Sequence, residues 1–203
     1  MLKSRSFILA SSSPRRRELL ARVGLDFEVI EPRVRERARE GEGPLDFAKR
    51  MAREKALSVS GSVRRGRIVV GSDTVVSVSG EILGKPKSEE DAFSMLQKLS
   101  GKTHEVITGF CVAKSPGEVI YLGATRTEVR MKSLDSKGMR RYIKTGEPMD
   151  KAGAYAIQGA GSCLVEWIRG SYTGVVGLPL FELVSVLSGI GVVEGFSPDE
   201  LEG

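Results

Sequence analysis

Three serines, a proline and three arginines follow one another near the start of the chain, from Ser11 to Arg17. Proline suits the first position of a helix, where its missing N–H would have no partner, and serine suits the cap position before it. We therefore expect Ser13 to cap a helix that begins at Pro14. The helix dipole is positive at this end, so three cations in the first turn are unfavourable unless an anion binds there. Serine hydroxyls, free N–H groups and guanidinium groups favour a phosphate site, with a solvated basic turn as the alternative.

A single carboxylate interrupts an apolar, β-branched stretch further along the chain. Asp73 follows Gly71 and Ser72 within residues 67–78, which are otherwise typical of a buried strand. Burying a carboxylate is unfavourable unless it is paired, hydrogen-bonded or bound to a metal ion. The two small residues before it leave room for a ligand, so we interpret Asp73 as a site residue. The alternative is a carboxylate satisfied by the backbone or by a neighbouring lysine.

Two lysines are placed where they can reach an anion. Lys55 lies on the apolar stripe of a helix predicted from Leu45 to Ser60. Its ammonium group either reaches solvent at the rim of the helix or points into a cleft toward phosphate. Lys85 belongs to a predicted tight turn, Gly84–Lys87, and can add a phosphate contact.

A glycine-rich stretch from Glu147 to Leu180 contains Asp150, Lys151 and Gln158. Glycine lets the backbone approach a ligand closely, which predicts a binding loop here. A turn-rich connector is the alternative. The spacing matches neither the dinucleotide-binding fingerprint nor the P-loop, so neither of these sites is predicted.

The elements that must position these residues alternate between strands and helices, which favours an α/β fold. The consecutive strands from His104 to Met131 predict an antiparallel portion beside the βα part, with a bulge at Gly123. The charge-dense residues 31–44 predict a mobile loop or lid. A short strand and an acidic tail are expected after the last helix. The predicted strands cover residues 7–10, 26–30, 67–78, 81–83, 104–114, 119–131 and 163–168, and the predicted helices begin near Pro14, Leu45, Ser88, Ser136 and Leu180.

Composition limits the classes of function that remain. The 203 residues suit a single domain, or two lobes that share one sheet. A net charge of +5 is compatible with nucleic acid or with a small polyanionic substrate. His104 is the only histidine, which argues against a histidine-rich zinc site and against a Ser-His-Asp triad. Cys111 and Cys163 are predicted to be buried thiols, with a disulfide left open. Because no apolar run approaches membrane-spanning length and no signal peptide is evident, we expect a cytoplasmic protein.

Seven motifs in this chain follow the order found in Maf proteins, and the match runs from about residue 8 to residue 180. The chain therefore resembles the Maf family. The resemblance implies one domain over residues 1–203, with an elongated mixed β-sheet flanked by helices, two lobes and a central nucleotide cleft, as in the inosine triphosphate pyrophosphatases. The motifs are SSSPRRRELL, REKA, VVGSDTVV, GKPKSEEDA, LSGKTHEVITG, GEPMDKAGAYAIQG and SYTGVVGLPL.

The resemblance also implies an activity. Maf proteins are nucleoside triphosphate pyrophosphatases, in which water cleaves the substrate to a monophosphate and pyrophosphate. Members of the family generally need a divalent metal ion, Mg²⁺ or Mn²⁺, and often form homodimers. Asp73 matches the family's proposed general base. Ser11, Arg16, Lys55 and Lys85 match positions that surround the phosphates.

Three further positions concern the nucleobase. Arg15, Thr74 and Gln158 match the residue types of the family branch that hydrolyses dTTP and UTP. The amide of Gln158 offers both a donor and an acceptor, so it can read the O4/N3 edge of thymine or uracil. A pocket that reads this edge should reject cytosine or a purine, because buried polar groups would be left unpaired.

One segment departs from the family pattern. Arg33 and Arg35 stand where many family members carry acidic residues, whereas Glu36 matches an acidic position of the family. Glu36 is therefore the best candidate in this segment for a metal ligand, together with Asp73.

Two other functions compete with a dTTP/UTP pyrophosphatase that clears surplus or non-standard nucleotides. One is a regulator of septum formation that binds nucleotide without turnover, and the intact set of Asp73, Lys55 and Lys85 argues against it. The other is nucleic-acid binding through the basic surface. The few aromatic residues do not interleave with basic ones as in a stacking platform, so we expect a nucleoside triphosphate as the partner and no nucleic acid or membrane.

Overall fold

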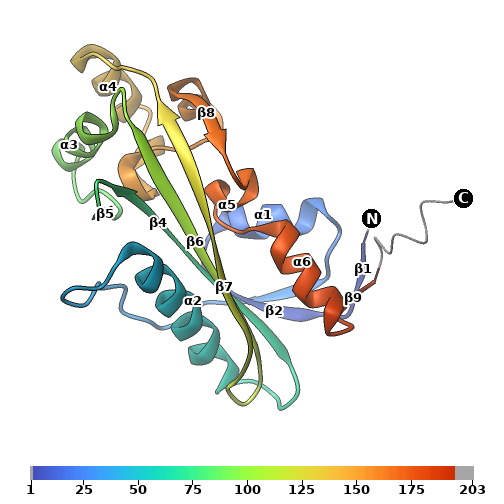
Figure 1. Ribbon diagram of the computed structural model, residues 1–203. Coiled ribbons are helices and arrows are strands. Elements are labelled where there is room, and N and C mark those ends of the chain that lie inside the picture. Colours follow the sequence, from blue (N-terminus) through green and yellow to red (C-terminus); the bar gives the residue numbers. More distant parts are fainter. Residues whose placement is uncertain (1, 195–203) are drawn as a thin grey trace, which may run out of the picture.

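A computed structural model describes residues 2–194 of the chain (Figure 1). Within this part, the main sheet has seven strands in the order β3-β2-β4-β6-β7-β8, with β5 paired to β4. A separate two-stranded sheet pairs β1 with β9. The predicted acidic tail lies outside the described residues. The strands are β1 (Lys3–Ser4), β2 (Phe7–Ala10), β3 (Phe27–Ile30), β4 (Ile68–Val78), β5 (Glu81–Leu83), β6 (Thr103–Lys114), β7 (Glu118–Met131), β8 (Val165–Arg169) and β9 (Val193–Glu194).

The main sheet is mixed, as predicted. Strand β2 pairs in parallel with β3 and β4, and the pairs β4–β6, β6–β7 and β7–β8 are antiparallel. The long strands β4, β6 and β7 run through the whole molecule and connect its two ends (Figure 1). The sheet is therefore one continuous frame for residues that are far apart in the sequence.

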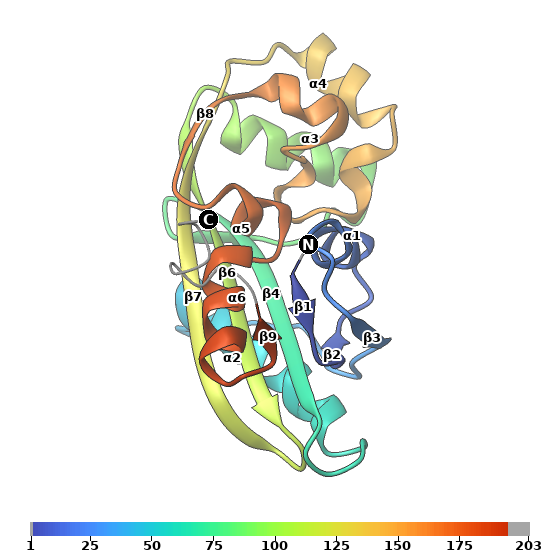
Figure 2. The same ribbon diagram turned by 90° about the vertical axis from the view of Figure 1, so that its right-hand side faces the viewer.

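Helices cover both faces of the sheet. Helix α2 packs on one face, and α1, α5 and α6 lie on the other (Figures 1 and 2). Helices α3 and α4 lie at the far end of the long strands (Figure 2). The helices are α1 (Pro14–Arg22), α2 (Pro44–Ser60), α3 (Glu89–Leu99), α4 (Ser136–Ile143), α5 (Tyr172–Val176) and α6 (Leu180–Gly189), with 3-10 helices η1 (Glu147–Asp150), η2 (Ala152–Ala154) and η3 (Gly159–Leu164).

The alternation of side chains along the strands explains these layers. In β2, Leu9 packs in a cluster with α1 and α6, whereas its neighbour Ile8 packs with the small residues of α2. A further apolar cluster joins α3 and α4 to the other end of β4, β6 and β7. The two ends of the sheet thus carry separate cores, which agrees with the predicted two lobes. That residues 1–203 act as one domain stays a prediction.

Two details of the strands differ from expectation. The irregularity between β6 and β7 lies between Val112 and Ala113, so the bulge predicted at Gly123 is wrong. Gly123 pairs in register with Phe110. A Cβ at Gly123 would lie 2.6 Å from a ring carbon of Tyr121. This glycine therefore makes room for an aromatic ring and does not mark a bulge.

The cysteines also differ from each other. Cys111 is buried in β6 as predicted, but Cys163 is exposed, and both are free thiols. The strand expected from Cys163 begins only at Val165. The preceding residues Gly159–Leu164 form η3, because two backbone N–H groups of this turn donate to the carboxylate of Glu147.

Candidate active site

The helix predicted after the serines is α1, with Pro14 in its first turn and Ser13 at its cap position. The predicted cap position is therefore confirmed, but within the described chain the Ser13 side chain makes no capping hydrogen bond. The Ser13 N–H instead donates to Ser11 Oγ at 3.2 Å, since the chain turns back on itself before the helix. The first N–H groups of α1 thus lack a serine cap, which is the condition that an anion-binding helix end requires.

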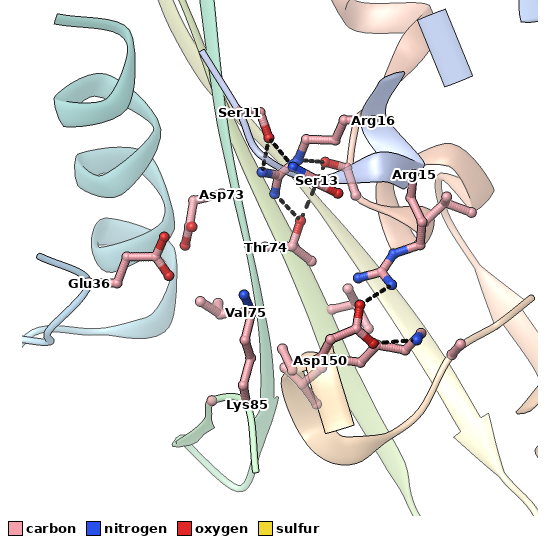
Figure 3. A pocket seen from close by; sticks show the side chains of 18 of the residues that line it. Ser11, Ser13, Arg15, Arg16, Glu36, Asp73, Thr74, Val75, Lys85 and Asp150 are labelled. Carbon is pink, nitrogen blue, oxygen red and sulfur yellow. Dashed lines mark hydrogen bonds and ion pairs between the residues drawn. The ribbon is translucent and has the colours of Figure 1, made fainter. Parts of the chain in front are cut away.

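Arg16 is buried, with 8% of its surface exposed, and its guanidinium group is held from three sides. Its Nε donates to the carbonyl of Gly177 at 2.7 Å, and its Nη1 donates to Ser11 Oγ at 3.1 Å. Its Nη2 donates to Thr74 Oγ1 at 3.3 Å (Figure 3). The Thr74 hydroxyl lies 2.9 Å from that of Thr108, its partner across β4 and β6. The guanidinium group is therefore fixed in place before any ligand binds.

Helix α2 lies very close to β4 and β6 because two strand residues beneath it are glycines. A Cβ at Gly71 would lie 2.4 Å from the carbonyl oxygen of Ala52, and one at Gly109 would lie 2.4 Å from that of Ala48. Neither gap can hold a methyl group. Because the helix lies this close, the buried side chain of Lys55 reaches Asp73 on the sheet.

Lys55 joins two carboxylates. Its Nζ lies 2.6 Å from Asp73 Oδ1 and 2.6 Å from Glu36 Oε1. The prediction that Lys55 points into a cleft is confirmed. The Asp73 carboxylate is paired with a neighbouring lysine, as the alternative interpretation expected, and this pair lines a pocket, while the role of Asp73 as a site residue stays a prediction.

Burial and the neighbouring charges shift the pKa values of Asp73, Glu36 and Arg16. Burial raises the pKa of the Asp73 carboxyl, and the nearby Lys55 and Arg16 oppose this shift. Burial also acts to raise the pKa of Glu36, but Lys55, Lys85 and Arg16 together outweigh it, so the Glu36 pKa lies below its usual value. Burial lowers the pKa of Arg16, which stays protonated because an arginine ordinarily titrates above about 12. A buried carboxylate thus stands among fixed cations.

The pocket has a volume of about 670 Å³ and is open to solvent along one side. The structure brings every predicted site residue to its wall, although their roles stay predictions. Its volume falls within the range of small-molecule sites. The charged residues of its wall are Arg15, Arg16, Lys55, Lys85, Lys151, Glu31, Glu36, Asp73 and Asp150.

The remaining predicted residues come from turns and loops around the pocket. Lys85 is exposed after β5 and points toward the carboxylates of Asp73 and Glu36 (Figure 3). Gln158 is half-buried just before η3. Arg15 Nη1 donates to Asp150 Oδ2 at 3.3 Å, so residues from opposite ends of the sequence meet across the pocket.

Sequence reasoning missed several supporting groups. The hydroxyl of Ser72 donates to the carbonyls of Gly109 at 2.9 Å and Gly177 at 3.2 Å. The hydroxyl of Thr108 donates to the carbonyl of Gly174 at 2.7 Å. These bonds fasten α5 and the residues after it to the sheet beside Arg16. Their signal was present, since Ser72 and Thr108 are polar residues within apolar strands.

The donor set fits a divalent cation that binds together with a substrate. Glu36 and Asp73 share the Lys55 ammonium group, so their near oxygens lie no farther apart than the sum of the two 2.6 Å contacts. Among residues 2–194, no group of three or more His, Cys, Asp or Glu side chains can enclose a metal ion. Mg²⁺ is commonly held by one or two carboxylates, water and substrate phosphates. This pair of carboxylates suits that open arrangement.

Comparisons with known proteins identify the family and support the fold. The sequence profile of the family described as Maf-like protein matches residues 6–190. A dTTP/UTP pyrophosphatase of Geobacter sulfurreducens is 50% identical over 186 residues, which are 92% of this chain and 97% of that protein. One of Thermococcus onnurineus is 50% identical over 184 residues, 91% of this chain and 97% of that protein. The solved structure of a HAM1 protein from Coxiella burnetii matches with a TM-score of 0.50 at 13% identity, covering 91% of this chain and 98% of that one, which supports the fold alone.

Proposed function

Because the chain belongs to the Maf-like protein family, we propose that it cleaves dTTP and UTP to the monophosphate and pyrophosphate, which removes surplus or non-standard nucleotides from the pool. One observation carries this proposal: the uncapped first turn of α1 and the buried carboxylate of Asp73 share a single pocket. Relatives with this activity in their names are about half identical to the chain over nearly its whole length.

The cations of the pocket hold the triphosphate. The first turn of α1 and the fixed guanidinium group of Arg16 line the pocket, and Lys85 lines it as well. Cleavage of a phosphoanhydride depends on positioning and on neutralising the charge that develops on the leaving oxygens. Charged groups that are already in place achieve this without reorganisation.

Asp73 prepares the water. In the proposed step, its carboxylate accepts a proton from a water molecule as the oxygen of that water bonds to the α-phosphorus. The bond to the bridging oxygen breaks, and pyrophosphate leaves with that electron pair. Burial raises the pKa of Asp73, and the ammonium group of Lys55 at 2.6 Å opposes this shift by favouring the ionised form. Glu36 and Asp73 would hold Mg²⁺ or Mn²⁺, which when bound neutralises phosphate oxygens and lowers the pKa of water.

Three residues of the pocket wall, Gln158, Arg15 and Thr74, recognise the nucleobase of the substrate. The amide of Gln158 can pair with both the acceptor and the donor on the O4/N3 edge of thymine or uracil. Arg15 lines the same pocket and is oriented by its hydrogen bond to Asp150. Thr74 contributes to nucleobase recognition indirectly, because its hydroxyl accepts a hydrogen bond from Nη2 of Arg16 and so helps to position that arginine.

The decisive experiment is a panel of dTTP, UTP, dCTP, dATP and dGTP with Mg²⁺ or Mn²⁺, with products separated by ion-exchange chromatography. We expect dTMP or UMP and pyrophosphate from the first two. Release of orthophosphate, or no turnover of either pyrimidine substrate, would reject the proposal. Tight binding of dTTP without turnover would favour the regulator of septum formation instead.

The proposal extends to assembly and location: a homodimer in the cytoplasm that binds no nucleic acid. Sedimentation and cell fractionation measure the first two, and titration with DNA or RNA measures the third. Among the described residues, no helix combines the length and apolar character needed to cross a bilayer.

A further inference from the structure

Residues 31–43, the charged segment that carries Glu36, form neither helix nor strand, yet one side chain of α2, Arg50, makes several hydrogen bonds to them. Arg50 Nε lies 2.5 Å from Glu42 Oε1, and Arg50 Nη2 lies 2.6 Å from Glu42 Oε2. The same Nη2 donates to the carbonyl of Arg37 at 3.0 Å. We call the pair of Arg50 and Glu42 the latch.

The latch differs from an ordinary surface ion pair. The side chains of Arg50 and Glu42 are 16% and 9% exposed. The guanidinium group also donates to Glu54 Oε1 at 3.0 Å and lies over the ring of Phe47, 5.5 Å from its centre. The hydrogen bonds from Arg50 lower the pKa of Glu42 to about 2. Paired, two-pronged contacts of this kind are both stronger and more specific in geometry than exposed single contacts.

The latch acts on the backbone beside Glu36. The Arg37 carbonyl that Arg50 holds belongs to the residue that follows Glu36 directly. The Glu36 side chain is itself 48% exposed, so its contact with Lys55 is open to water and weak as an anchor. The segment forms three ion pairs with α2: the latch, the contact of Glu36 with Lys55, and a 3.7 Å contact between Arg39 Nη2 and Glu54 Oε1. The latch is the one in which both side chains are mostly buried.

We propose that Arg50 and Glu42 are positioning residues for the reaction: they hold the segment so that the Glu36 carboxylate stands beside Lys55 and Asp73. This inference rests on the proposed function for its effect on turnover. That the latch holds residues 31–43 in place does not depend on the proposed function.

The first test compares kcat/KM for dTTP in Arg50→Met and Glu42→Gln with two controls. Glu40→Gln changes an exposed glutamate of the same segment, and Arg65→Met changes an exposed arginine; neither residue forms an ion pair among residues 2–194. We expect a loss of about 10- to 100-fold in the latch variants, as for other residues that orient a ligand or base. The controls should match wild type. Glu42→Gln keeps the size of the side chain, so it serves if Arg50→Met does not fold.

The second test is a double-mutant cycle, which separates positioning from general stability. If the latch acts through Glu36, Arg50→Met should lower kcat/KM by less than about 2-fold in a Glu36→Gln background. An equal loss in both backgrounds would overturn the inference. Arg50→Lys, which keeps the charge but loses the two-pronged geometry, should fall between wild type and Arg50→Met.

The third test needs no turnover. Hydrogen exchange followed by mass spectrometry should show faster exchange in residues 31–43 of the latch variants, with β4 unchanged. Unchanged exchange in this segment would overturn the inference even if activity fell. If wild type does not hydrolyse dTTP but the latch variants loosen the segment, the proposed function fails and the latch remains a holder of the segment. If wild type is active and every variant equals it, the inference alone fails.

Discussion

At the scale of single residues, the site depends on a carboxylate whose surroundings pull its pKa in two directions. Asp73 is 6% exposed, so burial raises its pKa, while Lys55 at 2.6 Å lowers it. The balance leaves a base that binds a proton more readily than an exposed aspartate and still has a cation to hold it ionised. A general base works best when its pKa lies near the working pH.

Replacing Asp73 by asparagine should abolish turnover but preserve nucleotide binding. The amide has nearly the same shape and can still accept from Lys55, but it cannot take a proton. We expect kcat for dTTP to fall by about 10²- to 10⁴-fold, with the dissociation constant from calorimetry nearly unchanged. Activity close to that of wild type would remove Asp73 from the role of base.

The pH dependence of kcat/KM should show which carboxylate titrates. A raised pKa means that Asp73 becomes protonated at a higher pH than an ordinary carboxyl, so activity should be lost as the pH falls toward that value. We expect the acid limb above about 4, the usual aspartate pKa. Since the Glu36 pKa is lowered, a limb at or below 4 would point to Glu36 and contradict the assignment of Asp73.

At the scale of elements, the site depends on how closely α2 lies on the sheet. Gly71 and Gly109 sit beneath the helix, and Ala48 and Ala52 face them from above. Lys55 reaches Asp73 from a helix in this position. The Arg50–Glu42 latch then adds a third element, the charged segment, to the same helix.

Gly109→Ala should both destabilise the protein and lower its activity. Its methyl group would meet the Ala48 carbonyl at 2.4 Å, so the helix has to shift and Lys55 with it. Overpacking of this kind costs about 1–3 kcal/mol, measurable by urea denaturation. Gly189→Ala is the control, because a Cβ there would meet no described atom within 4 Å apart from its chain neighbours and the backbone of its own helix. Equal stability of the two variants would contradict the close packing.

At the scale of the whole molecule, two cores on one continuous sheet enclose the site between them. The stability of this arrangement includes a buried histidine in the far core. His104 is 3% exposed, its Nε2 lies 2.7 Å from the hydroxyl of Tyr155, and burial lowers its pKa to about 4 from the ordinary 6.5. The folded protein therefore excludes a proton that the unfolded chain accepts below pH 6.5.

The free energy of unfolding should decrease between pH 6.5 and pH 4 because of His104. Stability is complete above pH 6.5 and falls as the pH decreases toward 4, because only the unfolded state gains the proton. Between pH 7 and pH 5 this amounts to about 2 kcal/mol of unfolding free energy. Asp73 acts with the opposite sign, so the measurement is the difference between wild type and His104→Gln in urea denaturation at each pH. A difference independent of pH would contradict the buried, neutral histidine.

Sequence patterns alone determined most of the fold. The strand from Ile68 to Val78, the apolar stripe of α2 and the Ser88 cap of α3 depend on neighbours within a few residues, and the structure has all three. Residue types also singled out Asp73 and the serine-arginine turn, because each breaks a local rule. Resemblance to a known family, rather than spacing, pointed to Glu36 and Thr74. The glycine-rich stretch had placed Gln158 in a predicted binding loop, and the resemblance added its role at the nucleobase.

Only the tertiary structure decided how these parts meet. Arg16 bonds to Gly177, 161 residues away, and Arg15 bonds to Asp150, 135 residues away. Tertiary packing also placed the irregularity of β6 and β7 away from Gly123 and left Cys163 exposed. Local propensity describes what one segment prefers by itself, whereas these outcomes depend on which distant groups supply a hydrogen bond or occupy space. For this reason the residues of the site could be predicted from the sequence, whereas their arrangement around one pocket is visible only in the tertiary structure.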